Sequence, residues 1–162
     1  MRKFIYKQYK KFRGCTIHET TMLNHFINKF PYVYQYIILQ FPISNINLKT
    51  KDFDLNILRD KKFIYSSRVD AIFINNDIFT LVEIKRTATL LSLLQISYYY
   101  NLMKANFPNK KYSKLIVLCQ RFNPIAIKHA DFLNIILIQL SGNPDDEPNF
   151  LTFGPEHFNE PV

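Results

Sequence analysis

Two acidic residues stand inside apolar segments of the chain. Asp70 lies in the run RVDAIFI and Glu83 in the run IFTLVEIK, with the turn-forming residues Asn75-Asn76-Asp77 between the two runs. A carboxylate buried among apolar side chains costs several kcal/mol, roughly, unless it is paired or binds a cation. These two acids therefore need a partner, and a hard divalent cation is one that two carboxylates can share.

A hairpin would bring the two acids together. With Asn76 and Asp77 as the two turn residues, the antiparallel register pairs Ile74 with Phe79, Ile72 with Leu81, Asp70 with Glu83, and Arg68 with Lys85. Side chains that face each other in this way have Cβ atoms about 4.5–5.5 Å apart, which suits two carboxylates that hold one cation. We therefore expect the two acids to form a metal site.

A lysine follows on the same face of the second strand. Side chains alternate along a strand, so Lys85 projects with Glu83 while Ile84 points away. In phosphodiester hydrolysis, Mg²⁺ polarises the phosphoryl oxygen, and an ammonium group stabilises charge or orients the attacking water. Arg68, opposite Lys85, would hold the incoming phosphate. The alternative interpretation is a structural salt-bridge cluster of these charged residues and Asp70 on an exposed sheet face.

Three motifs in the expected order resemble those of the PD-(D/E)XK nuclease superfamily. Asp70, twelve further residues and then Glu83-Ile84-Lys85 resemble its acid…(D/E)-x-K signature. The segment QISYY at 95–99 resembles the Q-x-x-x-Y motif of the RecB-type branch, and GCTIHE at 14–19 resembles that branch's G-x-x-x-H motif. The expected element order over 16–120 also resembles the family core. The small size is similar to that of compact stand-alone nucleases of archaeal viruses and mobile elements.

The resemblance implies a role for each matching residue of the central signature. Asp70 and Glu83 would be metal ligands, with the Ile84 carbonyl as a third, and Lys85 would be the catalytic lysine. Mg²⁺ is the implied cofactor, with Mn²⁺ as a substitute. The superfamily's common proline before the first acid is absent, since Val69 precedes Asp70.

The flanking motifs imply supporting roles. His18 would be an additional metal ligand, which Glu19 would replace or assist. Gln95 and Tyr99 would steady the site by hydrogen-bonding the catalytic lysine or the substrate backbone, because residues four apart share one helical face. Taken alone, each has a plainer interpretation: an ordinary amphipathic helix for the glutamine and tyrosine, and a surface or core histidine for His18.

The elements that position these residues follow from the hydrophobic pattern. It predicts a helix over 16–30 with a capping box at its start, a strand over 32–41 ended by Pro42, and a long connection over 43–67 with one short helix. After the hairpin come a helix from Thr87 or Thr89 to about Asn106, a buried parallel strand over 114–120, a short helix over 125–132 and a strand over 134–140. The expected fold is α/β and restriction-endonuclease-like: a single mixed sheet, with an antiparallel hairpin and a parallel crossover strand, flanked by helices.

Composition sets the class of protein. The chain has 162 residues, of which 48% are hydrophobic, and this suffices for one domain, expected over 1–140. No apolar stretch is long enough to cross a membrane, and no secretion signal is visible at the start. Cys15 and Cys119 are too few for a disulfide framework or an iron–sulfur cluster, so an intracellular, cytoplasmic location is expected, in the host cell if the protein is viral.

The charge distribution favours a polyanionic partner. The net charge is +8, although residues 141–162 hold five of the 13 acids and neither lysine nor arginine, and we expect them to form a loosely ordered acidic tail. Nucleic acid is the leading partner for so basic a body, ahead of an anionic membrane surface. The expected DNA-binding residues are Arg68 and Arg86 together with a basic N-terminal group: Arg2, Lys3, Lys7, Lys10, Lys11 and Arg13.

Three functions remain open at this point. The first is a Mg²⁺-dependent deoxyribonuclease of low sequence specificity, with an endonuclease favoured over an exonuclease. The second is a DNA-binding protein that keeps the nuclease fold but does not hydrolyse DNA. The third is a Holliday-junction resolvase that acts as a homodimer.

Overall fold

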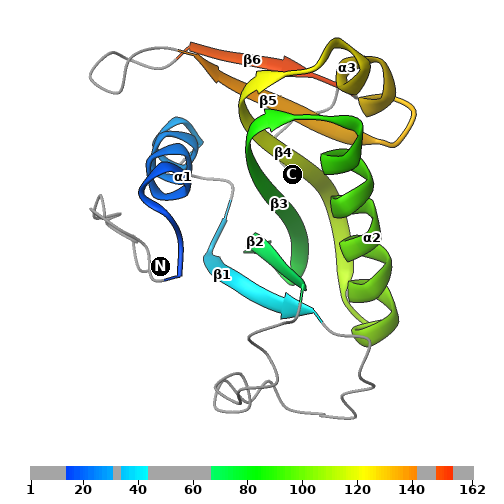
Figure 1. Ribbon diagram of the computed structural model, residues 1–162. Coiled ribbons are helices and arrows are strands. Elements are labelled where there is room, and N and C mark those ends of the chain that lie inside the picture. The colour runs from blue at the N-terminus through cyan, green and yellow to red at the C-terminus, as the bar shows by residue number, and fades with distance from the viewer. Residues whose placement is uncertain (1–13, 31–33, 44–66, 142–148, 155–162) are drawn as a thin grey trace.

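The computed structural model describes residues 14–30, 34–43, 67–141 and 149–154, which form one six-stranded sheet and three helices (Figure 1). The sheet order is β1-β2-β3-β4-β5-β6, so strands that follow each other in sequence are neighbours in space. The expected fold class, α/β with a single mixed sheet flanked by helices, is confirmed. The elements are α1 (Ile17–Lys29), β1 (Tyr36–Ile43), β2 (Ser67–Asn75), β3 (Ile78–Ala88), α2 (Leu90–Asn106), β4 (Lys111–Phe122), α3 (Pro124–Ala130), β5 (Ile135–Ser141) and β6 (Asn149–Phe153).

The predicted hairpin joins β2 and β3. Asn76 and Asp77 have φ angles of 46° and 66°, the left-handed conformation that a two-residue hairpin turn requires. The expected pairs Ile74–Phe79 and Ile72–Leu81 are present. The ladder ends at Ala71–Val82, so the two further pairs expected, Asp70–Glu83 and Arg68–Lys85, lie beyond its last paired residues.

The crossover from β3 to β4 runs through α2, as expected for parallel strands. Thr89 caps α2, and its hydroxyl accepts a hydrogen bond from the backbone N–H of Ser92. This decides between the two threonines considered at the start of the helix. β3 pairs in parallel with β4, and β4 with β5, which confirms the buried parallel strand predicted from its continuous apolar run.

The sheet separates two hydrophobic cores. Helices α2 and α3 cover one face, where Phe79 and Leu81 of β3 pack, while α1 covers the other face, where Val82 and Ile84 pack. From Phe79 to Ile84 this alternation assigns each residue of β3 to a face. We call these faces the α2 side and the α1 side.

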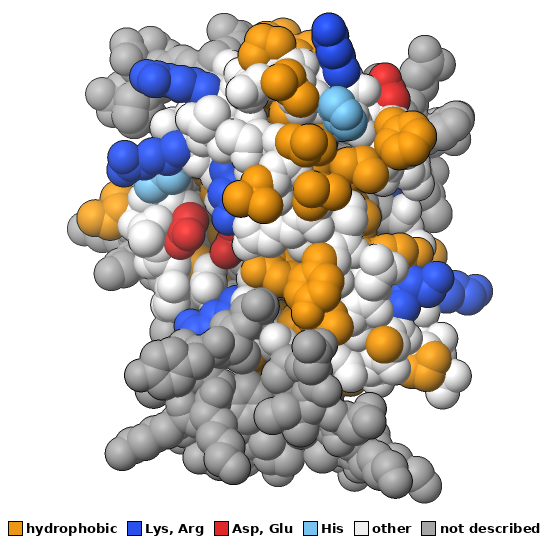
Figure 2. Space-filling view, turned by 45° about the vertical axis from the view of Figure 1, so that its right-hand side comes forward, with side chains coloured by type: hydrophobic (Ala, Val, Ile, Leu, Met, Phe, Trp, Pro, Cys, Tyr) orange, Lys and Arg blue, Asp and Glu red, His pale blue; other side chains and the backbone are white. Residues whose placement is uncertain are grey.

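The outer surface of the α2 side carries several exposed apolar side chains. Figure 2 shows hydrophobic side chains gathered on the face of the molecule turned toward the viewer. Exposed members on α2 are Leu91, Leu94 and Tyr98, whereas Leu93 and Ile96 of the same helix are fully buried in the core. The helix is thus apolar on both its inner and its outer surfaces.

Two strands differ from expectation. β1 continues through Pro42 to Ile43, and it tolerates the proline because an edge strand has unpaired backbone positions on its outer side. Part of the expected loose tail forms β6, which pairs antiparallel with β5 through contacts such as Ile138–Thr152. The segment NFLTF carries apolar residues within the polar tail, and it pairs with the preceding strand β5.

Several expectations fall outside the described residues. They concern the basic N-terminal group, the connection over 44–66 with its short helix, and the acids of the tail at 145–147, 156 and 160. Within the part of the chain that is described, no helix is long and apolar enough to cross a membrane.

Candidate active site

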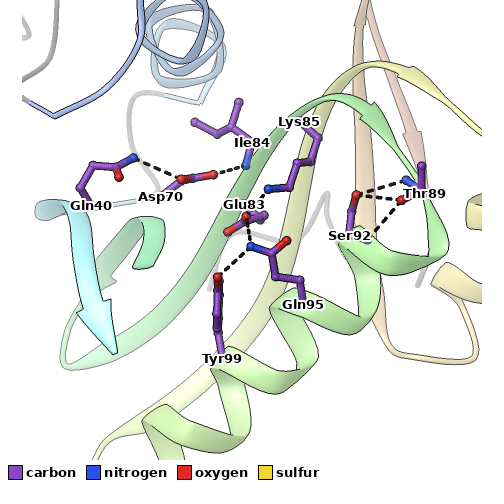
Figure 3. A network of polar contacts seen from close by, with 9 residues as sticks. All are labelled: Gln40, Asp70, Glu83, Ile84, Lys85, Thr89, Ser92, Gln95 and Tyr99. Carbon is purple, nitrogen blue, oxygen red and sulfur yellow. Dashed lines mark hydrogen bonds and ion pairs between the residues drawn. The ribbon is translucent and has the colours of Figure 1, made fainter. Parts of the chain in front are cut away.

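Asp70 lies where the ladder between β2 and β3 has ended. Its Oδ2 accepts a hydrogen bond of 2.8 Å from the backbone N–H of Ile84, and its Oδ1 accepts one of 3.2 Å from Nε2 of Gln40 (Figure 3). Burial raises the pKa of Asp70, and the Ile84 hydrogen bond and the Lys85 charge only partly oppose this. Beyond the end of the ladder, the Asp70 carboxylate therefore takes the place of a backbone carbonyl as the hydrogen-bond acceptor for Ile84.

Glu83 is the most deeply buried acid among the described residues, with 1% of its surface exposed. Its Oε1 lies 2.6 Å from Nζ of Lys85 and accepts a hydrogen bond of 2.9 Å from Nε2 of Gln95. Its Oε2 is buried and has no hydrogen-bond partner in the described parts of the chain. Burial, followed by the charge of Asp70, raises the pKa of Glu83 to about 7, although Lys85 opposes the shift.

Lys85 projects on the same side of β3 as Glu83, as the period of the strand predicted, while Ile84 packs in the core of the α1 side. Burial lowers the pKa of Lys85, but the hydrogen bond and charge of Glu83 outweigh it, so the pKa lies above its usual value. The side chain is 30% exposed. An ammonium group thus stands between the buried acid and solvent.

Helix α2 carries Gln95 and Tyr99 against this acid. Nε2 of Gln95 donates to Glu83 and also, over 2.7 Å, to the hydroxyl oxygen of Tyr99. The two residues therefore share one helical face, as their spacing predicted. The hydrogen bond of Gln95 goes to Glu83, whereas the sequence suggested the lysine or the substrate as its partner.

Helix α1 holds the two remaining predicted residues. Glu19 completes the capping box, since its Oε2 accepts from the backbone N–H of Thr16 over 2.6 Å. His18 has a buried Nε2 without a hydrogen-bond partner in the described segments, and burial followed by the charge of Arg86 lowers its pKa. Its imidazole is therefore neutral near pH 7.

The ligands do not gather as fully as the motifs implied. Among the residues that the structure describes, no group of three or more His, Cys, Asp and Glu side chains is placed to hold a metal ion. His18 and Glu19 thus do not join Asp70 and Glu83 in one such cluster. The role of His18 as a ligand stays a prediction.

The predicted DNA-binding residues that can be placed are exposed. Arg68 lies on β2 and pairs with Pro42 of β1, so its expected position opposite Lys85 is not part of the ladder. Arg86 follows Lys85 on β3 and lies near His18. Both are available to a polyanion at the surface.

Sequence reasoning missed Gln40. It is a lone polar residue in the apolar run YIILQF, the same signal that singled out Asp70 and Glu83. Its hydrogen bond to Asp70 joins β1 to the candidate site. The hydrogen bond from Ile84 to Asp70 had no signal in the sequence, because any residue type supplies a backbone N–H.

The donor set suits a hard divalent cation. Two coupled carboxylates supply oxygen atoms, and Oε2 of Glu83 lacks a partner within the described residues. A strand residue directs its N–H and C=O to the same neighbour, so the Ile84 carbonyl faces the strand gap that Asp70 occupies. These are the oxygen ligands that Mg²⁺ and Mn²⁺ prefer. Comparisons of the chain with protein-family models, curated proteins and solved structures found no match.

Proposed function

We propose that the protein is a deoxyribonuclease that depends on Mg²⁺, with Mn²⁺ as a substitute, and hydrolyses DNA phosphodiester bonds with little sequence specificity. The observation that carries the proposal is Glu83. Its carboxylate is buried, coupled to Asp70 and left with one oxygen atom unpartnered among the described residues. Lys85 contacts only Oε1 of Glu83, and the Asp70 backbone and the charge of Lys85 only partly offset the effect of burial on the pKa of Glu83.

In this proposal, Asp70, Glu83 and the Ile84 carbonyl hold the cation. A bound Mg²⁺ supplies polarisation of the phosphoryl oxygen and lowers the pKa of a coordinated water. Deep burial of Glu83 keeps competing solvent away from its oxygen atoms. Because burial and the neighbouring acid raise its pKa to about 7, a cation competes with a proton for this carboxylate at neutral pH.

Lys85 stabilises the negative charge that develops on the phosphate. Its ammonium group stays protonated near neutral pH and is partly exposed, so a phosphate can approach it. Gln95 and Tyr99 fix the side chain of Glu83 through the hydrogen bonds of the Gln95 amide. The positive net charge and the exposed Arg68 and Arg86 support a polyanionic substrate, and contacts to phosphates carry no base information.

The test is a cleavage assay with the full chain. Linear duplex DNA, linear single-stranded DNA and closed circular forms of both are incubated with Mg²⁺, Mn²⁺ or a chelator. We expect cleavage only with metal, and nicked or opened circles, because only an endonuclease cuts DNA that has no ends. Intact DNA under every metal condition would refute the proposal and favour a non-catalytic DNA-binding protein.

Two variants connect the activity to the site. Glu83→Gln and Asp70→Asn should each lose cleavage and keep metal-independent DNA binding, because the amides preserve shape but not ligand charge. Asp77→Asn is the matched control. That acid lies on the hairpin turn, 87% exposed, six residues along β3 from Glu83, or about 20 Å at about 3.3 Å per residue. Unchanged cleavage in the site variants would point to a contaminating nuclease, and an equal loss in the control would show a general effect of removing a carboxylate; either result would contradict the proposal.

A further inference from the structure

Strand β1 contains one residue with an unusual backbone. Gln40 has a φ angle of 52°, in the left-handed region that non-glycine residues rarely adopt. The pairs on either side of it are nevertheless kept, with Leu39 opposite Ala71 and Phe41 opposite Val69. Such a conformation is strained and persists only where its surroundings impose it.

This backbone conformation changes which face the following residues occupy. Before Gln40, Ile38 packs on the α2 side and Leu39 on the α1 side. Strict alternation would send Phe41 to the α1 side, yet Phe41 packs on the α2 side. The alternation therefore slips by one residue at Gln40.

The partner strand slips at the same level. Ala71 packs on the α1 side and Ile72 on the α2 side, and alternation would place Val69 with Ala71, yet Val69 packs on the α2 side. Asp70 lies between Ala71 and the displaced Val69, at the level of Gln40, which lies between their partners Leu39 and Phe41. The alternation of faces is thus interrupted in both strands at the same level, and the side chains of Gln40 and Asp70 meet there.

The Gln40 side chain is held from two directions. Its Nε2 donates to Oδ1 of Asp70 over 3.2 Å and to Sγ of Cys15 over 3.9 Å. Gly14, with a φ of 85°, lies beside its stem, and a Cβ there would come within 3.2 Å of Cγ of Gln40. The glycine that opens the G-x-x-x-H segment thus leaves room for this glutamine.

We propose that Gln40 is a positioning residue that fixes the orientation of the Asp70 carboxylate for metal binding. With Ile84 donating to one oxygen and Gln40 to the other, the carboxylate cannot rotate about its Cβ–Cγ bond without losing a hydrogen bond. Partners that orient a metal ligand in this way typically contribute about 10–100-fold to affinity or activity. The inference rests on the proposed function, because it assigns Gln40 to the same cation site.

The test is Gln40→Met, which keeps the length of the side chain and the backbone strain but removes the amide. Mn²⁺ binding to the protein alone is measured by calorimetry, and the Mg²⁺ concentration for half-maximal cleavage is measured with DNA. We expect Mn²⁺ affinity to fall about tenfold or more and the Mg²⁺ requirement to rise by a similar factor. A lower cleavage rate with unchanged metal affinity would overturn the inference, as would wild-type behaviour.

Gln35→Met is the matched control. Gln35 precedes the same strand, and its Nε2 donates to Oδ1 of Asn76 at the hairpin turn, away from Asp70. This variant should keep the metal affinity of the wild type. An equal loss in both variants would show a general effect of removing a glutamine amide and would contradict the inference.

A second variant covers failure of Gln40→Met to fold. Gln40→Gly removes the amide and also relieves the left-handed backbone, since glycine adopts a positive φ without cost. It should fold and show the same loss of Mn²⁺ affinity. Failure of both variants to fold would overturn the inference, because the side chain would then serve the fold. If the wild type neither binds Mn²⁺ nor cuts DNA, the proposed function itself fails, whereas a working wild type with an unchanged Gln40→Met refutes only the role of Gln40.

Discussion

Glu83 combines features that rarely coexist in a side chain with a purely structural role. A buried carboxylate costs several kcal/mol, roughly, and Lys85 and Gln95 compensate only one of its two oxygen atoms. The other oxygen has no partner among the described residues. Perturbed acids of this kind cluster at functional sites. A cation bound to this carboxylate would offset the remaining cost of its burial.

The separate role of Lys85 can be tested by replacing it with methionine. Lys85→Met should keep Mn²⁺ binding, because both carboxylates remain, but should lower the single-turnover cleavage rate by about 10²–10³-fold, as loss of one transition-state donor does. Lys110→Met is the control, since Lys110 pairs with Asp77 at the hairpin turn. A Lys85→Met rate within a few-fold of the wild type would remove this residue from the mechanism.

The raised pKa of Glu83 predicts a pH-dependent stability in metal-free protein. Between its ordinary pKa of 4.5 and the folded value of about 7, the folded state binds a proton that the unfolded chain has released. The free energy of unfolding should therefore fall as pH rises through this window and level off above it, by up to a few kcal/mol. Urea unfolding of the wild type and Glu83→Gln, both in chelator, measures the effect. A difference between them that stays constant across this pH range would contradict it.

At the scale of elements, the helices begin where local chemistry places them. Thr16 forms the predicted capping box with Glu19, and Thr89 caps α2. Such signals involve residues three apart and are therefore readable from the sequence. The extension of β1 through Pro42 depends on its pairing with β2, and the formation of β6 depends on its pairing with the preceding strand β5; neither pairing is stated by the composition of the segment itself.

Two neighbouring leucines of α2 provide a matched test of its packing. Leu93 is fully buried, so Leu93→Ala should lower the free energy of unfolding by about 2–5 kcal/mol. Leu94 is 48% exposed, and Leu94→Ala should change the free energy of unfolding by about 0.5 kcal/mol or less. Chemical denaturation measures both. Similar losses would mean that the outer surface of α2 is covered in solution.

At the scale of the whole molecule, sequence patterns predicted the strands from β1 to β5 and the three helices, but neither β6 nor the geometry of the site. The hairpin register, the parallel crossover and the face of Lys85 all follow from periods and turn residues. The position of Asp70 does not, because it depends on where the β2–β3 ladder ends and on the backbone of Gln40. The pairing of strands at a distance determines both.

The positive charge of the chain predicts how its DNA binding responds to salt. For metal-free Glu83→Gln, the logarithm of the affinity for DNA should fall linearly with the logarithm of the salt concentration. The slope should be about −0.9 for each duplex phosphate contacted. Arg86→Gln should make the slope shallower by about one unit, because one phosphate contact is lost. Lys110→Gln, in which the lost ammonium group pairs with Asp77 of the hairpin turn, should leave the slope unchanged. Fluorescence anisotropy measures the slopes, and an affinity indifferent to salt would exclude phosphate-driven binding.

The hydrogen bond from Ile84 to Asp70 makes one amide of the chain a natural spectroscopic reporter. Most amides in a sheet donate to carbonyl groups, whereas this one donates to an ionisable group. Its proton chemical shift should therefore follow the titration of the carboxylate and its capture of a diamagnetic ion such as Mg²⁺. A single resonance in an amide NMR spectrum would then record occupancy at the strand gap, without DNA and without turnover.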